Sequence, residues 1–93
     1  MRILLIDNEA PLRAVLGSMI LQQFPEYTNI EEAYSVASGV EKIMSFQPDL
    51  VLLDIELDDG TGFDILQQLP HHSFQLIFTT AFNQYAIQAF RFS

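Results

Sequence analysis

The sequence contains no cysteine and has few basic residues. Without cysteine the chain can form neither disulfides nor thiolate metal sites. Only four lysine and arginine residues stand against 12 acidic ones, which gives a net charge of −8. Because nucleic-acid binding needs clustered basic side chains, we expect no direct nucleic-acid contact by this segment.

Long apolar stretches are also missing. No run approaches the roughly 20 residues of a membrane span, and the stretch Met1–Asp7 is too short for a signal peptide. Together with the lack of cysteine, this predicts a cytoplasmic protein that makes no membrane contact. A length of 93 residues, 49% of them hydrophobic, suits one domain with a single core, so we expect one domain over residues 1–93.

Short apolar runs predict the strands. None of them alternates with polar residues, which is typical of strands covered on both faces of a parallel sheet. A fourth stretch of mixed polarity, Asn29–Tyr34, suits an edge strand. The three apolar runs are Ile3–Ile6, Leu50–Leu53 and Leu76–Phe78.

Four segments with helical spacing lie between or after these runs. Pro11 suits the first turn of the first helix, and Ser35 is a favourable N-cap for the second. The resulting order, strand–helix four times, predicts an α/β domain with a parallel sheet and helices on both faces. The apolar positions are Leu12, Val15, Leu16, Met19 and Ile20; Val36, Val40, Ile43 and Met44; Phe63, Ile65, Leu66 and Leu69; and Tyr85, Ala86, Ala89 and Phe90.

Polar residues follow three of the predicted strands. They are Asp7-Asn8-Glu9 after the first, Asp54 after the third and Thr79-Thr80 after the fourth. Ligands of open parallel sheets bind at the carboxyl ends of the strands. If the first and third strands are neighbours, we expect Asp7, Asn8 and Asp54 to converge on one crevice.

Convergent carboxylates repel one another, and a bound Mg²⁺ would relieve that repulsion. Mg²⁺ prefers oxygen ligands and binds through one or two carboxylates with water and phosphate. A carboxylate beside such a cation can attack phosphorus and form an aspartyl phosphate. This chemistry would make Asp54 the nucleophile, and the threonine hydroxyls would bond a phosphoryl oxygen.

Each of these features also has a structural interpretation. Asp7, Asn8 and Glu9 are suited to capping the first helix, Asp54 can be a strand-to-loop residue, and threonine is common in strands. The segment Asp58–Gly62 is typical of a turn that leads into a helix. The combination of three polar strand ends is what favours a functional site.

These same residues resemble the receiver domains of response regulators. Ile3–Glu9 is similar to the family's first strand and acidic pair, and Pro48–Leu57, with Gly62-Phe63 after it, is similar to the phospho-acceptor segment. Phe78–Phe90 resembles the LytTR-type subgroup, whose members usually carry a C-terminal DNA-binding domain. The resemblance implies a flavodoxin-like, doubly wound fold with strand order 2-1-3-4, and a sensor histidine kinase as partner.

The resemblance also implies the role of each residue. Asp54 would accept the phosphoryl group, and Thr80 would be the switch hydroxyl. Mg²⁺ would be held by Asp7, Asn8, Asp54 and the backbone carbonyl of Glu56. Secondary candidates are Glu9, which would add negative charge, and Thr79, a strand neighbour of Thr80.

The sequence departs from the family pattern at three places. Asn8 stands where aspartate is commoner, which predicts weaker Mg²⁺ binding, and Asp58 stands where proline is usual. The chain ends before the family's fifth strand, its Lys-Pro motif and its last helix. No residue replaces that lysine, since Lys42 lies in the second helix. An uncovered edge strand and first helix would favour self-association through that edge and the region of the fourth helix.

Three functions remain open on the sequence. The first is a phospho-switch module that signals to a DNA-binding output domain and, beyond Mg²⁺-dependent self-phosphorylation and self-dephosphorylation, is not an enzyme. The second is a degenerate receiver that acts only through protein contacts, which Asn8 favours and Asp54 disfavours. The third is a phosphohydrolase with Asp54 as nucleophile, which the short loops and Glu56 at the expected acid–base position disfavour.

Overall fold

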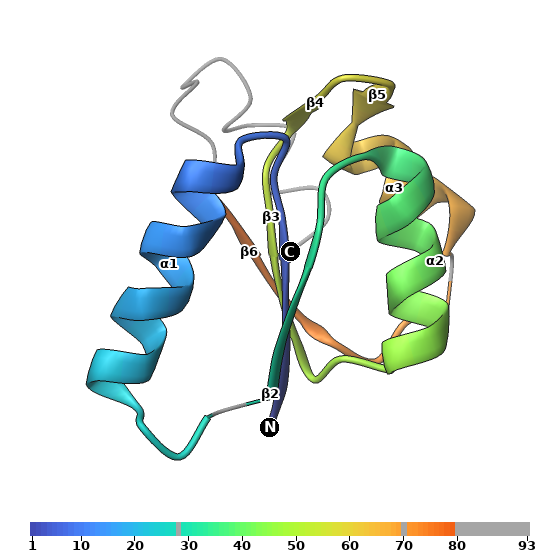
Figure 1. The fold of residues 1–93 in the computed structure, drawn as a ribbon. Coiled ribbons are helices and arrows are strands. Elements are labelled where there is room, and N and C mark those ends of the chain that lie inside the picture. The colour runs from blue at the N-terminus through green and yellow to red at the C-terminus, as the bar shows by residue number, and fades with distance from the viewer. Residues whose placement is uncertain (28, 70, 80–93) are drawn as a thin grey trace.

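The computed structural model describes residues 1–27, 29–69 and 71–79 as an α/β domain (Figure 1). Thr80 and the fourth predicted helix, at Tyr85–Phe90, lie outside the described residues. The main sheet has four strands, which are β1 (Arg2–Ile6), β2 (Asn29–Ala33), β3 (Leu50–Leu53) and β6 (Gln75–Phe78). The four predicted strand positions are confirmed, each to within a residue or so at its ends.

All neighbouring strands of this sheet run parallel, in the order β2-β1-β3-β6. This is the predicted order 2-1-3-4, because β6 is the fourth long strand along the chain. Ile6 of β1 pairs with Leu53 of β3, and Leu53 pairs with Phe78 of β6. The carboxyl ends of the three strands that precede the candidate residues therefore lie side by side.

Helices cover both faces of the sheet (Figure 1). Helix α1 (Ala10–Gln23) lies on one face, and α2 (Val36–Phe46) and α3 (Gly62–Gln68) lie on the other. The main core is between the sheet and the α2–α3 layer, where side chains alternate so that every second strand residue points inward. Its strand members are Leu4, Ile6, Ala33, Val51 and Leu53, with Leu76 and Phe78 packed against them.

Helix α2 begins as the sequence predicted. The Ser35 hydroxyl accepts a hydrogen bond from the backbone N–H of Ser38 at 3.0 Å, and the Ser38 hydroxyl accepts from the backbone N–H of Ser35 at 3.0 Å. This reciprocal cap satisfies two donors that the first turn leaves free. Gly39 lies where a Cβ would come within 2.8 Å of Ile65 Cδ1, so this glycine lets α2 and α3 pack closely.

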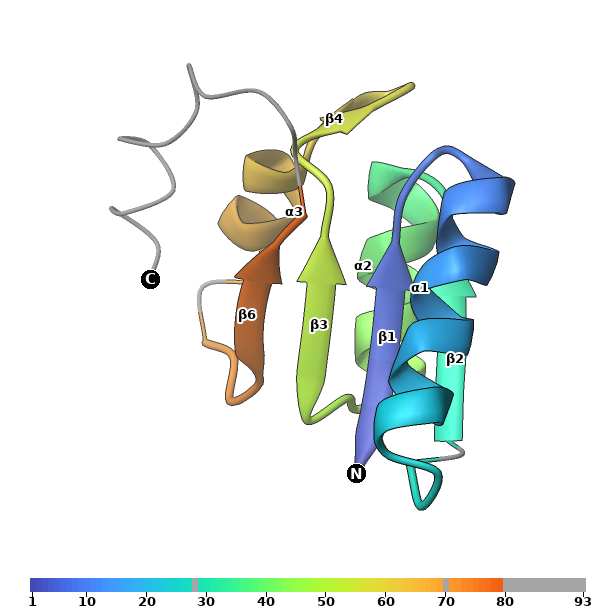
Figure 2. The same cartoon turned by 90° about the vertical axis from the view of Figure 1, so that its left-hand side faces the viewer.

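Helix α1 forms where its pattern predicts, but its apolar stripe is only partly covered. Val15 and Met19 are 53% and 56% exposed, and no residue of α1 is fully buried. In Figure 2, α1 lies in front of β1 and β2, while β3 and β6 stand beside it. The five apolar positions of α1 cover more of the helix surface than the sheet contacts. The apolar pattern therefore predicted the helix correctly but predicted more burial than the structure shows.

The segment after β3 differs from the prediction of a simple turn. Residues Glu56–Leu57 form β4 and Gly60–Thr61 form β5, a small antiparallel hairpin with Asp58 and Asp59 at its tip. Thr61 then caps α3, since its hydroxyl accepts from the backbone N–H of Asp64. The hairpin carries the chain from the end of β3 directly into α3.

Gly62, the first residue of α3, lies against the end of β3. A Cβ at this position would come within 2.7 Å of the Asp54 carbonyl oxygen and 2.9 Å of Leu53 Cγ. Its N–H donates to the Ile55 carbonyl at 2.8 Å. The absence of a side chain at Gly62 thus fixes how closely α3 approaches the backbone of Asp54.

We predict that Gly62→Ala lowers the free energy of unfolding by about 1–3 kcal/mol, because the methyl group meets backbone that cannot move aside. Gly17→Ala is the matched control, since a Cβ there has an ordinary 3.8 Å contact with Leu5. The control should raise stability by roughly 0.5–1 kcal/mol through helix propensity. Urea unfolding of both variants is the measurement, and equal stabilities for the two would contradict the close approach.

Candidate functional site

Three candidate residues lie in one row across the ends of the strands. The backbone ladder continues one residue past the paired strands: Asp7 N–H donates to the Ala33 carbonyl at 3.1 Å, Asp54 N–H to Ile6 at 2.9 Å and Thr79 N–H to Leu53 at 3.0 Å. Extending the register by one residue places Asp7 beside Asp54 and Asp54 beside Thr79. Because side chains alternate along strands, all three lie on the face opposite the main core.

Asp7 is a buried acidic residue, with only 2% of its surface exposed. One carboxylate oxygen, Oδ1, accepts a hydrogen bond from the backbone N–H of Glu9 at 2.8 Å. The other, Oδ2, is buried and has no hydrogen-bond partner among the described residues. Since a buried charge without a partner is unfavourable, this oxygen is suited to a cation that the protein does not itself supply.

Asp54 is half-buried at the tip of β3, and its environment resists ionisation. Burial raises the pKa of this carboxyl, and the negative charge of Asp7 raises it further. Hydrogen bonds from backbone N–H groups, including one from Glu56 to Oδ1 at 3.3 Å, act in the opposite direction. The register of β1 with β3 places the two residues at adjacent strand ends, where the negative charge of Asp7 disfavours ionisation of Asp54.

Asn8 and Glu9 lie at the rim of the same site. Both are exposed. Asn8 Nδ2 donates to Asp58 Oδ1 at 3.1 Å, which links the end of β1 to the tip of the β4–β5 hairpin. Glu9 occupies the N-cap position of α1, but its side chain makes no capping hydrogen bond. Glu9 is therefore the N-cap residue of α1 by its backbone conformation, but its carboxylate does not cap the helix.

The donor atoms in this region fit a hard divalent cation. They comprise the two carboxylates of Asp7 and Asp54, the amide of Asn8 and the nearby backbone of Glu56, and oxygen donors of this kind are those that Mg²⁺ prefers. The unpartnered Asp7 Oδ2 provides the structural test of fit. Within residues 1–27, 29–69 and 71–79, no three His, Asp or Glu side chains cluster as a metal-binding group, so the set depends on two carboxylates and neutral oxygens.

Asp59 anchors the loop that follows Asp54 to α2, a role that the sequence did not reveal. Its Oδ1 accepts from the backbone N–H of Val36 at 2.7 Å and its Oδ2 from that of Ala37 at 3.1 Å. These two hydrogen bonds hold the pKa of Asp59 below its ordinary value. The carboxylate thus caps the N-terminus of a helix that is distant in the sequence, where negative charge is favourable.

Arg13 is a second residue that the sequence analysis missed. Its Nη1 donates to the backbone carbonyl of Asp7, and its Nε pairs with Glu32 Oε1 at 2.7 Å. Arg13 thereby joins α1 to the ends of β1 and β2. The available signal was that it is the one basic residue in the first predicted helix, one turn after the acidic residues.

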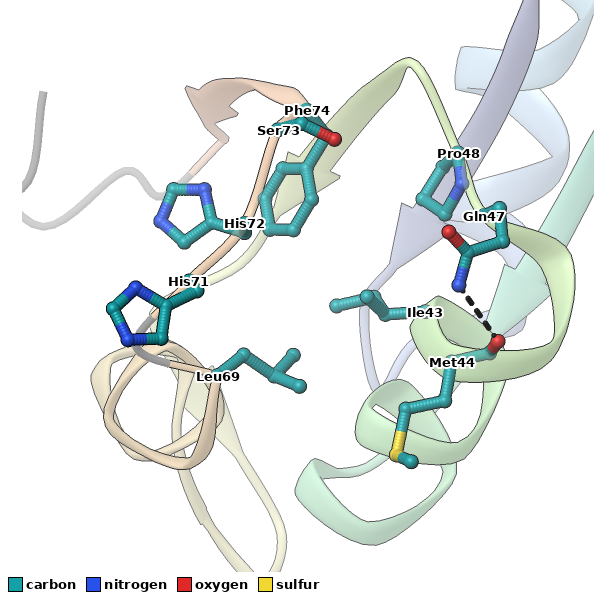
Figure 3. Close-up of a pocket in the computed structure, with 9 residues that line it drawn as sticks. All are labelled: Ile43, Met44, Gln47, Pro48, Leu69, His71, His72, Ser73 and Phe74. Atoms are coloured by element: carbon teal, nitrogen blue, oxygen red, sulfur yellow. Dashed lines mark hydrogen bonds between the residues drawn. The ribbon is translucent and has the colours of Figure 1, made fainter.

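The two histidines lie at the opposite end of the sheet. His71 and His72 are exposed, and His72 stacks on Phe74 with ring centroids 4.4 Å apart. They line a small hollow of about 200 Å³ between the end of α2 and the segment before β6 (Figure 3). This position separates both histidines from the acidic row.

The chain is thus a parallel α/β domain with two acidic residues side by side at the carboxyl edge of its sheet. Residues 3–92 match the model of the response regulator receiver domain family. The chain belongs to this family and is the receiver domain of a two-component response regulator. Receiver domains interact with sensor histidine kinases, generally need Mg²⁺ for phosphorylation and are not enzymes in the usual sense.

The relatives with similar sequences are sensory transduction proteins. The chain is 42% identical to LytT of Enterococcus faecalis over 93 residues, which covers 98% of this chain and 38% of the relative. It is 35% identical to LytT of Bacillus subtilis over 92 residues, with 97% and 38% covered. These matches confirm the LytTR-type resemblance, and the chain spans less than two fifths of the length of these relatives.

Solved structures agree with this assignment. The chain is similar to the response regulator MaeR bound to beryllium trifluoride, with a TM-score of 0.74, 27% identity, and 100% of this chain and 80% of that chain covered. A LuxR-family DNA-binding response regulator from Staphylococcus aureus shares the fold, with a TM-score of 0.84, 23% identity, and 98% and 79% covered. In the described part of the chain, no helix is long and apolar enough to cross a membrane.

We predict that Asp54→Asn raises the thermal unfolding temperature at pH 7 in the absence of divalent cations. Because the pKa of Asp54 is raised in the folded state, its ionised form opposes folding. The difference in unfolding temperature between the variant and the wild type should disappear below the ordinary pKa of 3.8, because the carboxyl is then protonated in both the folded and the unfolded chain. The difference should grow as the pH rises through the raised pKa of the folded state. Scanning calorimetry at several pH values measures it, with exposed Glu41→Gln as the control for simple charge removal.

Asp59→Ala should have the opposite pH dependence. The lowered pKa of Asp59 means that its contribution to stability is present above the ordinary value of 3.8 and is lost as the pH falls through the lowered value. The variant should therefore unfold at a lower temperature than the wild type at pH 7, and the gap should narrow in acid. Asp58→Ala, which removes only the exposed contact with Asn8, is the matched control. A larger loss for Asp58→Ala than for Asp59→Ala would contradict the capping role.

Proposed function

We propose that this receiver domain accepts a phosphoryl group on Asp54 from a sensor histidine kinase or a small phosphodonor. The observation that carries the proposal is the placement of a half-buried carboxylate with a raised pKa beside the buried, partly unpartnered carboxylate of Asp7. MaeR, a solved relative, is bound to beryllium trifluoride, a phosphoryl analogue, which supports the same chemistry here.

In the proposed reaction a carboxylate oxygen of Asp54 attacks the phosphorus atom. The new bond is an acyl phosphate, and the bond between phosphorus and the leaving group of the donor breaks with its electron pair. The backbone N–H of Glu56, which already donates to Asp54 Oδ1, orients the carboxylate for this attack. Self-dephosphorylation would be the attack of water on the same phosphorus; the bond between phosphorus and the Asp54 oxygen breaks with its electron pair on that oxygen, which gives inorganic phosphate and the free carboxylate.

We propose that Mg²⁺ is held by Asp7, Asn8, Asp54 and the backbone carbonyl of Glu56. The bound cation would neutralise the two carboxylates and the incoming phosphoryl charge. Asn8 contributes an uncharged oxygen, so binding should be weaker than with two aspartates at the end of β1. Exposed Glu9, whose side chain makes no capping bond, would add negative charge at the rim.

Thr80 is the proposed switch hydroxyl, and its movement toward the phosphoryl group would carry the signal onward. The likeness to LytT sensory transduction proteins supports an output domain outside these 93 residues, with transcription as the regulated process. Residues 1–93 would then be one receiver domain of a cytoplasmic protein whose partner is a sensor histidine kinase. The hairpin contacts of Asp58 and Asp59 would couple the acceptor loop to β1 and α2.

Intact-mass detection of phosphorylation tests this function. The complete protein that contains these residues is incubated with acetyl phosphate, with and without Mg²⁺. We expect a Mg²⁺-dependent mass increase that Asp54→Asn abolishes and Asp7→Asn reduces at least about tenfold, as for loss of a charged group at a metal site. Asp64→Asn, an acidic residue of α3 outside the row, is the control. A wild-type protein without adduct, beside a working receiver, would refute the proposal.

We further propose that copies of the domain associate through β6 and the apolar surface beside it. Among the described residues β6 is an edge strand, and Ile77 is 51% exposed. Ile77 also lines an apolar hollow of about 200 Å³ with residues of β1, β3 and the end of α1. Light scattering over a range of concentrations checks this, with Ile77→Lys expected to reduce association and a stable wild-type monomer contradicting it.

A further inference from the structure

Asn8 and Asp58 are joined by a hydrogen bond, and both residues depart from the family pattern. Asn8 Nδ2 donates to Asp58 Oδ1 at 3.1 Å, although the two positions are 50 residues apart in the sequence. Asparagine stands where aspartate is commoner, and aspartate stands where proline is usual. The usual pair of residues could not make this contact, because a carboxylate has no donor and a proline side chain has no acceptor. The two departures are therefore complementary.

The hydrogen bond spans the carboxyl edge of the sheet between β1 and β3. Asn8 follows Asp7 at the end of β1, and Asp58 is at the tip of the hairpin that follows Asp54. Figure 2 shows this hairpin extending from the end of β3 toward β1. The same hairpin begins with Glu56, whose backbone carbonyl is a proposed ligand of the cation. One hydrogen bond thus connects two segments that carry proposed Mg²⁺ ligands.

The contact fixes which end of the Asn8 amide is free. A carboxylate accepts hydrogen bonds and donates none, so Asp58 takes the Nδ2 end of the amide. The oxygen end, Oδ1, is then left for another partner. Asn8 is exposed, and without this contact its amide could turn its NH₂ group toward a cation, which that group repels. Asp58 therefore holds the amide in the orientation that leaves its oxygen available as a ligand.

Asp58 is not placed to be a ligand itself. In the part of the chain that the structure describes, no three acidic or histidine side chains form a metal-binding group, so Asp58 does not join Asp7 and Asp54 in such a cluster. Its side chain contacts the site through the amide of Asn8. Groups that hydrogen-bond a metal ligand orient that ligand, and their loss lowers metal affinity by about ten- to a hundredfold.

We propose that Asp58 is a positioning residue of the cation site and that it orients the amide oxygen of Asn8 toward Mg²⁺. This inference rests on the proposed function, because it requires Asn8 to be a ligand. An aspartate at position 8 would need no such orientation, since both of its carboxylate oxygens can bind a cation. An asparagine needs it, and Asp58 provides it. The contact thus offsets part of the disadvantage of an uncharged ligand at this position.

Calorimetric titration with Mg²⁺ tests this role in the complete protein that contains these residues, without a phosphodonor. We expect Asp58→Ala to weaken Mg²⁺ binding about tenfold, because the amide is no longer held. Asp58→Asn should keep most of the affinity, since its side-chain oxygen can still accept from Asn8. In an Asn8→Asp background, Asp58→Ala should have a much smaller effect, because no amide remains to be oriented.

Thermal unfolding without divalent cations is the second measurement. Asp58→Ala should unfold close to the wild-type temperature, because a contact between two exposed side chains contributes little to stability. The loss of Mg²⁺ affinity would then be separate from any damage to the fold. A markedly lower unfolding temperature would assign the contact to stability and contradict the proposal.

Three results of the titrations would overturn the role of Asp58. The first is an Asp58→Ala variant that binds Mg²⁺ as tightly as the wild type. The second is an equal loss for Asp58→Ala and Asp58→Asn, which would indicate charge alone. The third is an equal loss in the Asn8 and Asn8→Asp backgrounds, which would mean that Asp58 acts independently of Asn8. A wild-type protein that binds no Mg²⁺ would instead refute the proposed cation site, and this inference would fall with it.

Discussion

The repulsion between the carboxylates of Asp7 and Asp54 is the constraint on which the site depends. The parallel pairing of β1 with β3 places them side by side at the edge of the sheet. Asp7 is almost fully buried, and its charge raises the pKa of Asp54. The ionised form of Asp54 is therefore unfavourable in the folded domain. In the proposed function, a bound cation would relieve this unfavourable charge.

The structure around this edge is correspondingly well supported. Arg13 bonds the carbonyl of Asp7, and Asp59 caps α2 with two hydrogen bonds from the loop that follows Asp54. Gly62 lets α3 begin in direct contact with the acceptor backbone. These contacts join both helical layers to the ends of β1 and β3. The end of β3, where Asp54 lies, is therefore connected directly to α2 and α3.

Membership of the receiver family and the likeness to LytT proteins agree with this physical description. If the domain acted only through protein contacts, the carboxylates of Asp7 and Asp54 would have no role in its function. The raised pKa of Asp54 and the unsatisfied oxygen of Asp7 disfavour that alternative, because a site without function could relieve both by a single neutral substitution. The phosphohydrolase alternative remains disfavoured, since the loop after β3 is a short hairpin that leads directly into α3.

The sequence by itself determined the strand positions and the residues of the acidic row, because buried parallel strands are continuous apolar runs and polar residues after them stand out. The strand order followed from the resemblance to receiver domains, and the structure confirms it. The sequence also identified the Ser35 cap. Tertiary structure alone decided the roles of Arg13 and Asp59, which act on backbone groups distant in the sequence. It likewise decided that Thr79, an ordinary strand residue by composition, has a buried hydroxyl beside Asp54. The local sequence shows which segments prefer helix or strand and which of their faces are apolar. These contacts join segments that are distant in the sequence, so they depend on which segments the fold brings together.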